Sequence, residues 1–403
     1  IKPAHEATLE WVFEDAHKTH TPWDSFKHWL HNKAGLYWIT GKAGSGKSTL
    51  VKFLDKDHRL RASLARLASN APLIVASYYS WNPGDILQKS QEGLFRTFLL
   101  QVFKHQLDRV PTFHQLRRAF EKLVTQTERS VKILLVIDGL DEFEPTDASY
   151  TELADMFIMV TQSPNIKAIL SSRALSAFEA SSADYPKLRL HQLIRSDIQK
   201  YVDDRLSGHD RIAELSDGDA DGGRVLISEI VSASSGVFLW VRLVVGLLLE
   251  GFQKVDALED LRRKLKTMPR DLDDLFMRML RQIPEEYKMQ SSRIFQIRRF
   301  QPEPDGYVMT AFLLYYSEMS LKQSVKASIT PITREEQARV NKEIEGRLRS
   351  RCAGLFELST AHGGAFTGTS TICGYNIFTK VLQTGLEETH MGPNPDAHST
   401  HVL

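Results

Sequence analysis

Short apolar runs alternate with longer amphipathic segments over the first half of the chain. The apolar runs are rich in Val, Ile, Leu and Tyr and predict buried β-strands at 35–40, 73–79, 131–137, 167–171 and 187–190. Helical periodicity fills the intervals between them, at 50–67, 87–106, 112–126 and 149–161. Strands that alternate with helices predict an α/β fold of three layers, a mostly parallel sheet with helices on both faces.

The alternation ends near residue 195, and the remainder of the chain is predicted to be mostly helical. A Gly- and Asp-rich stretch at 208–223 predicts a loop or hinge. The most apolar run, 236–251, is shorter than the ~20 residues that span a bilayer and contains Arg242, so we interpret it as a buried helix. The tail from Gly363 is rich in Gly, Ser and Thr, and we expect it to be poorly ordered.

These patterns predict four parts of the chain. We expect a helical lead-in segment at 1–34, the α/β domain at 35–194, a helical lid domain at 195–300 and a partly helical region at 301–403. The first residue is Ile1 rather than Met, and no secretory signal is recognisable. We therefore expect a fragment of a longer protein or a processed one, whose C-terminal end could also be truncated.

One motif lies directly between the first predicted strand and the first predicted helix. Residues 41–48, GKAGSGKS, match the pattern G-x-x-x-x-G-K-[ST]. Glycines allow a tight turn that points successive N–H groups at phosphate oxygens, and the helix that follows adds its positive dipole end. In this pattern Lys47 reaches the β- and γ-phosphates, and the Ser48 hydroxyl can ligate Mg²⁺. The motif predicts a phosphate-binding loop, and with it the α/β fold of a P-loop NTPase.

Acidic residues follow the third predicted strand. That strand delivers Asp138 to the carboxyl edge of the sheet, where ligands bind in open α/β folds. A carboxylate there can hold Mg²⁺ through water, opposite Ser48. Asp141 and Glu142 lie just beyond and could orient or deprotonate an attacking water. Alone, such a run could be a solvated acidic turn, but the phosphate-binding loop upstream favours the metal site.

A third candidate, Arg173, ends the fourth predicted strand. An arginine at this edge lies near the expected position of a γ-phosphate and can pair with its oxygens. We interpret Arg173 as a sensor of the nucleotide state. The alternative is a surface arginine that happens to follow a strand.

Charge and cysteine content narrow the choice of partners. Lys and Arg total 51 against 50 Asp and Glu, a formal net charge of +1. A broad electrostatic attraction to nucleic acid or to an anionic membrane needs more positive charge, so we expect neither partner. Two cysteines cannot form a disulfide scaffold, which fits a reducing, cytoplasmic location.

With these motifs in place, the sequence resembles the NACHT-type P-loop NTPases of the signal-transducing STAND class. It looks most like fungal NLR-like proteins and their relatives with a nephrocystin-3-like N-terminal NTPase module. The resemblance runs from about Ala4 to Phe300 and includes the blocks GLYWITGKAGSGKSTL, LLVIDGLDEFE, SPNIKAILSSR and SGVFLWVRLVVGLLLEG.

The resemblance implies a sheet in which another strand separates the phosphate-loop strand from the acidic strand, followed by the lid. It also implies exchange of ATP or GTP with Mg²⁺ as an on/off switch, slow hydrolysis, and assembly into a homo-oligomer that engages unknown effector or sensor partners. By motif, phosphate and Mg²⁺ would be bound by Gly41, Lys42, Ala43, Gly44, Ser45, Gly46, Lys47, Ser48 and Thr49. Asp138 would be the Mg²⁺ aspartate, Asp141 or Glu142 the hydrolytic acid and Arg173 the sensor.

The sequence also departs from this family. Many members carry a proline at a lid helix start that contacts the adenine, where this chain reads Ser235-Gly236-Val237-Phe238. The winged-helix segment that commonly follows the lid is not recognisable. Three other functions stay open: a non-hydrolysing scaffold stabilised by nucleotide, a kinase or transport ATPase with fast turnover, and a nucleic-acid-directed ATPase.

Overall fold

The fold is described from a computed structural model of the chain. It describes residues 3–14, 23–32, 35–68, 71–80, 86–103, 111–125, 131–143, 149–206, 222–253, 257–300, 310–317, 332–353, 355–360 and 370–374. The chain divides into two compact units, Ile1–Thr267 and Met268–Leu403. The division falls inside the 195–300 segment that we expected to form the lid.

A parallel sheet forms the centre of the first unit. Its strands are β1 (Gly35–Thr40), β2 (Leu73–Tyr79), β3 (Lys132–Asp138), β4 (Ile166–Ser172) and β5 (Lys187–Arg189). They pair in the order β2-β3-β4-β1-β5, and every pairing is parallel. The α/β fold class is therefore confirmed. β4 lies between β1 and β3, as the resemblance implies, so the phosphate-loop strand and the acidic strand are separated by one strand.

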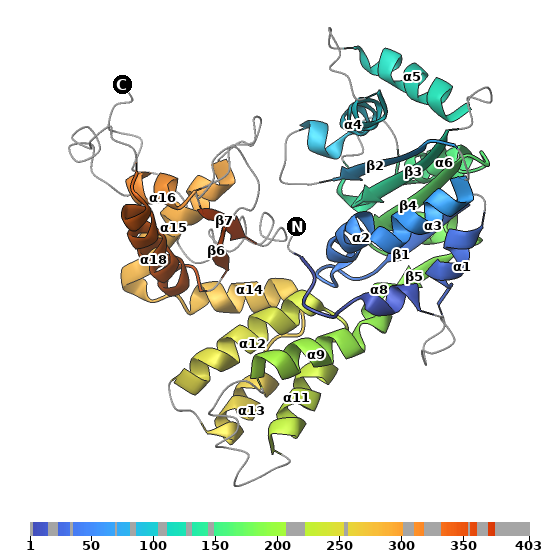
Figure 1. Cartoon of the computed structure of the whole chain (residues 1–403). Helices are drawn as coiled ribbons and strands as arrows, with labels where there is room; N and C mark the ends of the chain where they lie inside the picture. Colours follow the sequence, from blue (N-terminus) through green and yellow to red (C-terminus); the bar gives the residue numbers. More distant parts are fainter. Residues whose placement is uncertain are drawn as a thin grey trace. The chain divides into compact units, whose positions relative to one another are not determined.

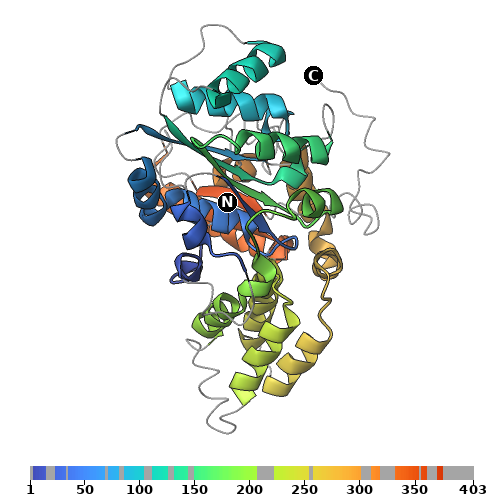
Figure 2. The same cartoon turned by 90° about the vertical axis from the view of Figure 1, so that its right-hand side faces the viewer.

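Helices cover both faces of this sheet (Figures 1 and 2). One apolar core joins β1–β4 to four helices: α4 (Gln91–Phe103), α5 (Phe113–Thr125), α6 (Tyr150–Val160) and α7 (Ser176–Ser181). On the other face lie α1 (Phe26–His31), α2 (Lys47–Lys56) and α3 (His58–Ala68). There the rings of Phe26 and Trp29 pack against Tyr37 of β1. The described part of this unit also contains the 3₁₀ turns η1 (Glu10–Phe13), η3 (Ile86–Lys89) and η4 (Leu140–Glu142).

The segment predicted as one helix at 50–67 is two helices, and the prediction of a continuous helix is wrong. α2 ends at Lys56, Asp57 is extended, and α3 begins at His58. The Asp57 carboxylate accepts the backbone N–H of Arg59 at 2.7 Å. An acidic side chain that accepts an N–H in the first turn is a typical start of a new helix, so Asp57 separates the two.

The outer edge of β2 is covered by a side chain. Gln101 of α4 donates from Nε2 to the Ser77 carbonyl at 2.9 Å and accepts the Ser77 N–H on Oε1 at 2.8 Å. A carboxamide thereby satisfies both backbone groups of Ser77, as a neighbouring strand would.

A group of helices follows the sheet within the first unit, in the segment that we expected to form the lid, and we keep the name lid for it. The short α8 (Leu190–Leu193) leads into α9 (Arg195–Leu206), α11 (Gly222–Ala233), α12 (Phe238–Gln253) and α13 (Leu258–Lys266). The apolar run predicted as a buried helix is α12, and Trp240, Val244 and Leu248 on it are fully buried. Among the described residues no helix is long and apolar enough to cross a membrane. Nearly all of the stretch predicted as a loop at 208–223 lies outside the described residues, and α11 begins at Gly222.

The second unit combines helices with a small antiparallel sheet. Its described elements are α14 (Leu272–Arg281), α15 (Glu285–Phe300), α16 (Ala311–Ser317), α18 (Arg334–Arg351), β6 (Phe356–Thr360) and β7 (Ser370–Gly374). The expectation of poor order from Gly363 is wrong for 370–374, where β-branched Thr371 and Ile372 favour a strand; the rest of that tail lies outside the described residues.

Candidate functional site

The phosphate-binding loop joins the carboxyl end of β1 to the first turn of α2. Gly44 and Gly46 have φ angles of 69° and 99°, a region that residues with a Cβ rarely adopt. At Gly41 a Cβ would lie 2.7 Å from the Ser45 Oγ and 3.5 Å from Leu190. Three glycines are thus needed for this loop to close tightly and to lead into a helix whose N-terminal amides are open to an anion.

Several buried side-chain oxygens in this region have no hydrogen-bond partner. Among them are the Ser45 Oγ in the loop and the Asp138 Oδ1 at the end of β3, on residues that are 1% and 3% exposed. Buried polar atoms without partners are rare in native folds and mark sites that bind an ion or a polar ligand. These orphaned atoms, in and next to a glycine-rich loop, fit a nucleotide phosphate with Mg²⁺.

Lys47 is at the centre of the charged groups of the site. Its Nζ donates to the carbonyls of Gly41 and Lys42 at 3.0 and 3.1 Å. Burial lowers the pKa of Lys47, while the nearby carboxylates of Asp141, Asp138 and Glu142 raise it and Arg173 lowers it further. The Lys47 ammonium group therefore lies within electrostatic range of all four residues that were predicted to bind the metal, to orient the water or to sense the nucleotide.

Asp138 is a buried carboxylate at the predicted metal position. Burial raises its pKa, and the Ser48 hydroxyl, together with the Lys47 charge, opposes that rise. A divalent cation would favour the ionised form, because it supplies the positive charge that the buried carboxylate lacks. Ser48 and Asp138 are thus the residues that would hold Mg²⁺. No group of three or more metal-ligating His, Cys, Asp or Glu side chains occurs in the described ranges.

A left-handed glycine turns the chain sharply after Asp138. Gly139 has φ 76° and begins η4, which carries Asp141 and Glu142 back along the edge of the sheet. The Glu142 carboxyl carbon lies over Gly139, 3.5 Å from where a Cβ would be. A Cβ at 139 would make only ordinary contact with Glu142, so the positive φ is what favours glycine here.

Asp141 and Arg173 form an ion pair across neighbouring strands. Arg173 donates from Nε to one Asp141 oxygen at 2.5 Å and from its backbone N–H to the other at 2.8 Å. The Asp141 side chain is 6% exposed and that of Arg173 is 47% exposed. Burial lowers the pKa of Arg173, but Asp141 raises it above its usual value overall, so the guanidinium stays charged.

The lid contacts the phosphate-binding loop directly. Leu239, near the start of α12, donates its N–H to the Gly44 carbonyl at 2.9 Å. Lys42 donates from Nζ to the Ser235 carbonyl at 3.2 Å. Gly236 (φ 77°) packs so closely on α8 that a Cβ there would lie 1.8 Å from the His191 carbonyl oxygen. The turn at 235–236 is therefore fixed by backbone contacts.

His191 is a residue of the site that the sequence analysis missed. Its Nδ1 is buried without a partner, and burial together with Lys42, Arg189 and Lys47 lowers its pKa. Its position, two residues after β5, brings it beside the loop only because β5 pairs with β1. No local motif marks it, although a polar residue at the carboxyl end of a predicted strand is a signal that could have been followed.

Two family models match the chain. Residues 7–173 match nephrocystin 3, N-terminal, and residues 282–389 match a domain of unknown function, DUF7791. The second match ends at residue 389, whereas the resemblance described from the motifs ended at about Phe300.

One curated relative is the vegetative incompatibility protein HET-E-1 of Podospora anserina. It is 26% identical over 275 residues, which are 62% of this chain and 19% of that protein. This chain therefore corresponds to about a fifth of its relative's length.

Solved structures give weaker likenesses. Drosophila ORC bound to DNA has a TM-score of 0.38 and 13% identity, over 96% of this chain and 94% of that one. The ORC2 protein of Aeropyrum pernix, in ADPNP-ADP complexes, has a TM-score of 0.38 and 11% identity over 91% of each chain. The family match is the more specific finding, and through residues 7–173 it confirms the resemblance to the nephrocystin-3-like NTPase module.

Proposed function

We propose that this chain is a nucleotide-dependent signalling switch that binds ATP/ADP or GTP/GDP with Mg²⁺ and hydrolyses the triphosphate slowly. The observation that carries the proposal is the meeting of three parts at one edge of the sheet. They are the glycine cradle with its orphaned Ser45 and Asp138 oxygens, the Asp141–Arg173 pair, and a lid hydrogen-bonded to the cradle itself.

Each residue has a distinct task in this proposal. The loop amides and Lys47 bind the phosphates, and Ser48 and Asp138 hold Mg²⁺, which neutralises phosphate charge when bound. Glu142 orients the attacking water, since the Asp141 carboxylate is already engaged by Arg173. Arg173 pairs with the terminal phosphate. Because the lid rests on the Gly44 carbonyl, the nucleotide bridges core and lid.

The switch follows from the two contacts of the lid. A diphosphate favours the closed lid, and a triphosphate that recruits Arg173 favours a second arrangement, in which copies of the chain assemble. A ligand shifts such an equilibrium only by its difference in affinity for the two states, so Arg173 has to discriminate between the two nucleotides. Similarity to a vegetative incompatibility protein supports a signalling role of this kind.

The test is to purify the chain, denature it and identify released nucleotide by chromatography, beside Lys47→Ala. We expect about one ADP or GDP per chain from the wild type and none from the variant, with both equally folded by circular dichroism. Nucleotide retained by Lys47→Ala would overturn the loop assignment. An empty wild type that turns over many times per second would favour a metabolic kinase or transport ATPase instead.

A further inference from the structure

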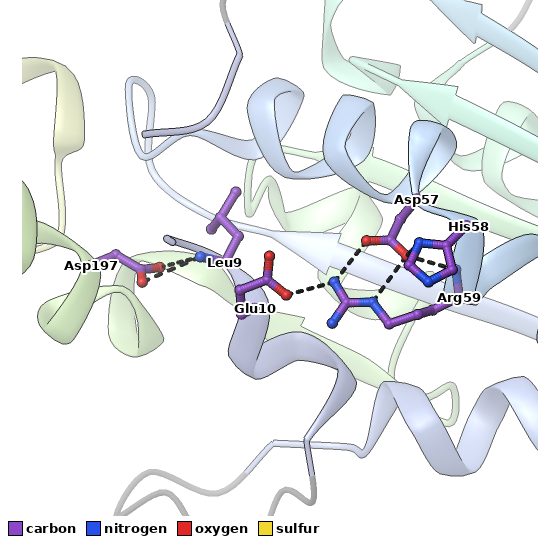
Figure 3. Close-up of polar contacts among 6 residues, drawn as sticks. All are labelled: Leu9, Glu10, Asp57, His58, Arg59 and Asp197. Atoms are coloured by element: carbon purple, nitrogen blue, oxygen red, sulfur yellow. Dashed lines mark hydrogen bonds and ion pairs between the residues drawn. The ribbon is translucent and has the colours of Figure 1, made fainter. Parts of the chain in front are cut away.

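Residues 3–14, which we call the strap, lie between the lid and the core of the first unit (Figure 3). Leu9 and Glu10 are adjacent in the sequence, yet Leu9 contacts Asp197 of lid helix α9 and Glu10 contacts Arg59 of core helix α3. A single short segment therefore touches both parts whose closure the nucleotide is proposed to govern.

The contact with the lid is built on a buried carboxylate. Asp197, in the first turn of α9, is 6% exposed. Its two oxygens accept the Leu9 N–H, each at 3.3 Å, and one of them accepts the indole Nε1–H of Trp11 at 2.8 Å. No cationic side chain pairs with it in the part of the chain that the structure describes. Because burying a carboxylate without a cation is unfavourable, its two strap N–H donors account for its presence there.

The strap is shaped to make this contact. Ala7 and Leu9 have φ angles of 55° and 68°, a region that residues other than glycine, asparagine and aspartate rarely adopt. Thr8 and Leu9 are buried while Ala7 and Glu10 are exposed, so the turn inserts these two residues into the protein. A second tie lies along the same helix, where His5 Nε2 is 2.8 Å from the Asp204 carboxylate.

The contact with the core is an ion pair. The Arg59 guanidinium is 2.6 Å from the Glu10 carboxylate and 2.7 Å from that of Asp57, and its centre is 4.1 Å from the centroid of the Phe13 ring. Arg59 is therefore held in place by Asp57, two residues before it in the sequence, and offers a fixed partner to the strap.

Contacts continue from the strap to the phosphate-binding loop. Tyr201 lies one turn after Asp197 on α9, and its ring is 5.1 Å from that of His5 in the strap. The same ring is 5.1 Å from Phe238, the first residue of α12. The next residue, Leu239, donates its N–H to the Gly44 carbonyl. The Tyr201 ring therefore contacts both the strap and the start of α12, the helix that is hydrogen-bonded to the phosphate-binding loop.

We propose that the strap holds the lid against the phosphate-binding loop through Asp197, and that release of the strap from this carboxylate opens the lid and frees the bound nucleotide. Asp197 is a positioning residue in this scheme, since it acts through α9 and α12. The statement about nucleotide rests on the proposed function, whereas the statement about the lid does not.

The test compares Asp197→Asn and Trp11→Phe with the matched control Asp203→Asn in the same chain. Asp203 lies on the same helix and bonds to Gln199 rather than to the strap. Hydrogen exchange would follow the amides of the strap and of Leu239, and a chase with unlabelled nucleotide would give the release rate of a fluorescent ADP. Trp11→Phe keeps a ring and removes only the indole donor, so it remains informative if Asp197→Asn folds poorly.

We expect Asp197→Asn to lose protection at both the strap and Leu239 and to release nucleotide about tenfold faster. Trp11→Phe should have a smaller effect on hydrogen-exchange protection and on the release rate. Asp203→Asn should change neither. Loss of strap protection with unchanged protection at Leu239 would overturn the proposal, as would a strap that stays protected in Asp197→Asn. A wild type that binds no nucleotide would refute the proposed function, while the exchange at Leu239 would still decide whether the strap holds the lid.

Discussion

Arg173 and Asp141 face each other across the carboxyl ends of two strands, joined by one backbone and one side-chain hydrogen bond at 2.8 and 2.5 Å. The two residues come from η4 and from the residue after β4, and they meet because β3 and β4 are neighbours in the sheet. The arginine is therefore held at the end of the sheet where a terminal phosphate is expected, by a carboxylate that cannot easily move.

Arg173→Gln should remove discrimination between nucleotides. If the guanidinium pairs with the terminal phosphate, its loss weakens triphosphate binding by about tenfold or more and leaves diphosphate binding nearly unchanged. Titration calorimetry with ADP and with a non-hydrolysable triphosphate measures both affinities. An equal fall for the two nucleotides would remove the sensor role and leave a structural ion pair.

Glu142→Gln should stall hydrolysis while preserving binding. A carboxylate that orients water contributes about 10²–10⁴-fold to the rate, so single-turnover phosphate release should slow by at least the lower of these factors. Asp141→Asn serves as the comparison, since its carboxylate is already bound to Arg173 and should matter through the arginine. If Asp141→Asn abolishes turnover and Glu142→Gln does not, the two roles are exchanged.

Gly236→Ala should destabilise the first unit and loosen the lid. Its φ of 77° and a Cβ 1.8 Å from the His191 carbonyl oxygen force the turn away from α8. A left-handed alanine alone costs about 1–2 kcal/mol, and the clash adds to it. The control is Gly246→Ala on α12, where a Cβ meets nothing within 4 Å. Gly246→Ala should be neutral or raise the free energy of unfolding by up to about 1 kcal/mol, and equal behaviour of the two variants in urea unfolding would contradict this account.

Stability of the first unit should rise between about pH 8 and pH 10 because of Lys167. This residue of β4 is 4% exposed, and its Nζ donates to the Trp29 carbonyl at 2.6 Å. Burial lowers its pKa to about 8. The unfolded chain therefore binds more protons than the folded one over this range, so raising the pH favours folding, by up to about 3 kcal/mol in full.

The measurement is the urea midpoint at several pH values, followed by tryptophan fluorescence. All 6 tryptophans lie within residues 1–267, so the signal reports on this unit. Lys167→Met supplies the control, because it keeps the length of the side chain and removes the titrating group. The rise with pH should vanish in Lys167→Met; a rise of the same size there would assign it to other groups.

The sequence predicted those features of the site that local patterns encode. Apolar runs predicted the five strands of the parallel sheet but not β6 and β7, and the glycine spacing of residues 41–48 predicted the loop. Both patterns depend on neighbours in the chain. The break at Asp57 was missed because helical periodicity continues through it, and a side-chain cap overrides periodicity. The strap was also missed. Leu9 and Asp197 are 188 residues apart, and their contact exists only once the lid has folded beside the core.

The Gln101 side chain has a consequence for how copies of this protein can associate. Its carboxamide occupies both backbone groups of Ser77 on the outermost strand, so an incoming β-strand would first have to displace it. Gln101 thereby protects this margin of the sheet from edge-to-edge growth of the kind that leads to fibres.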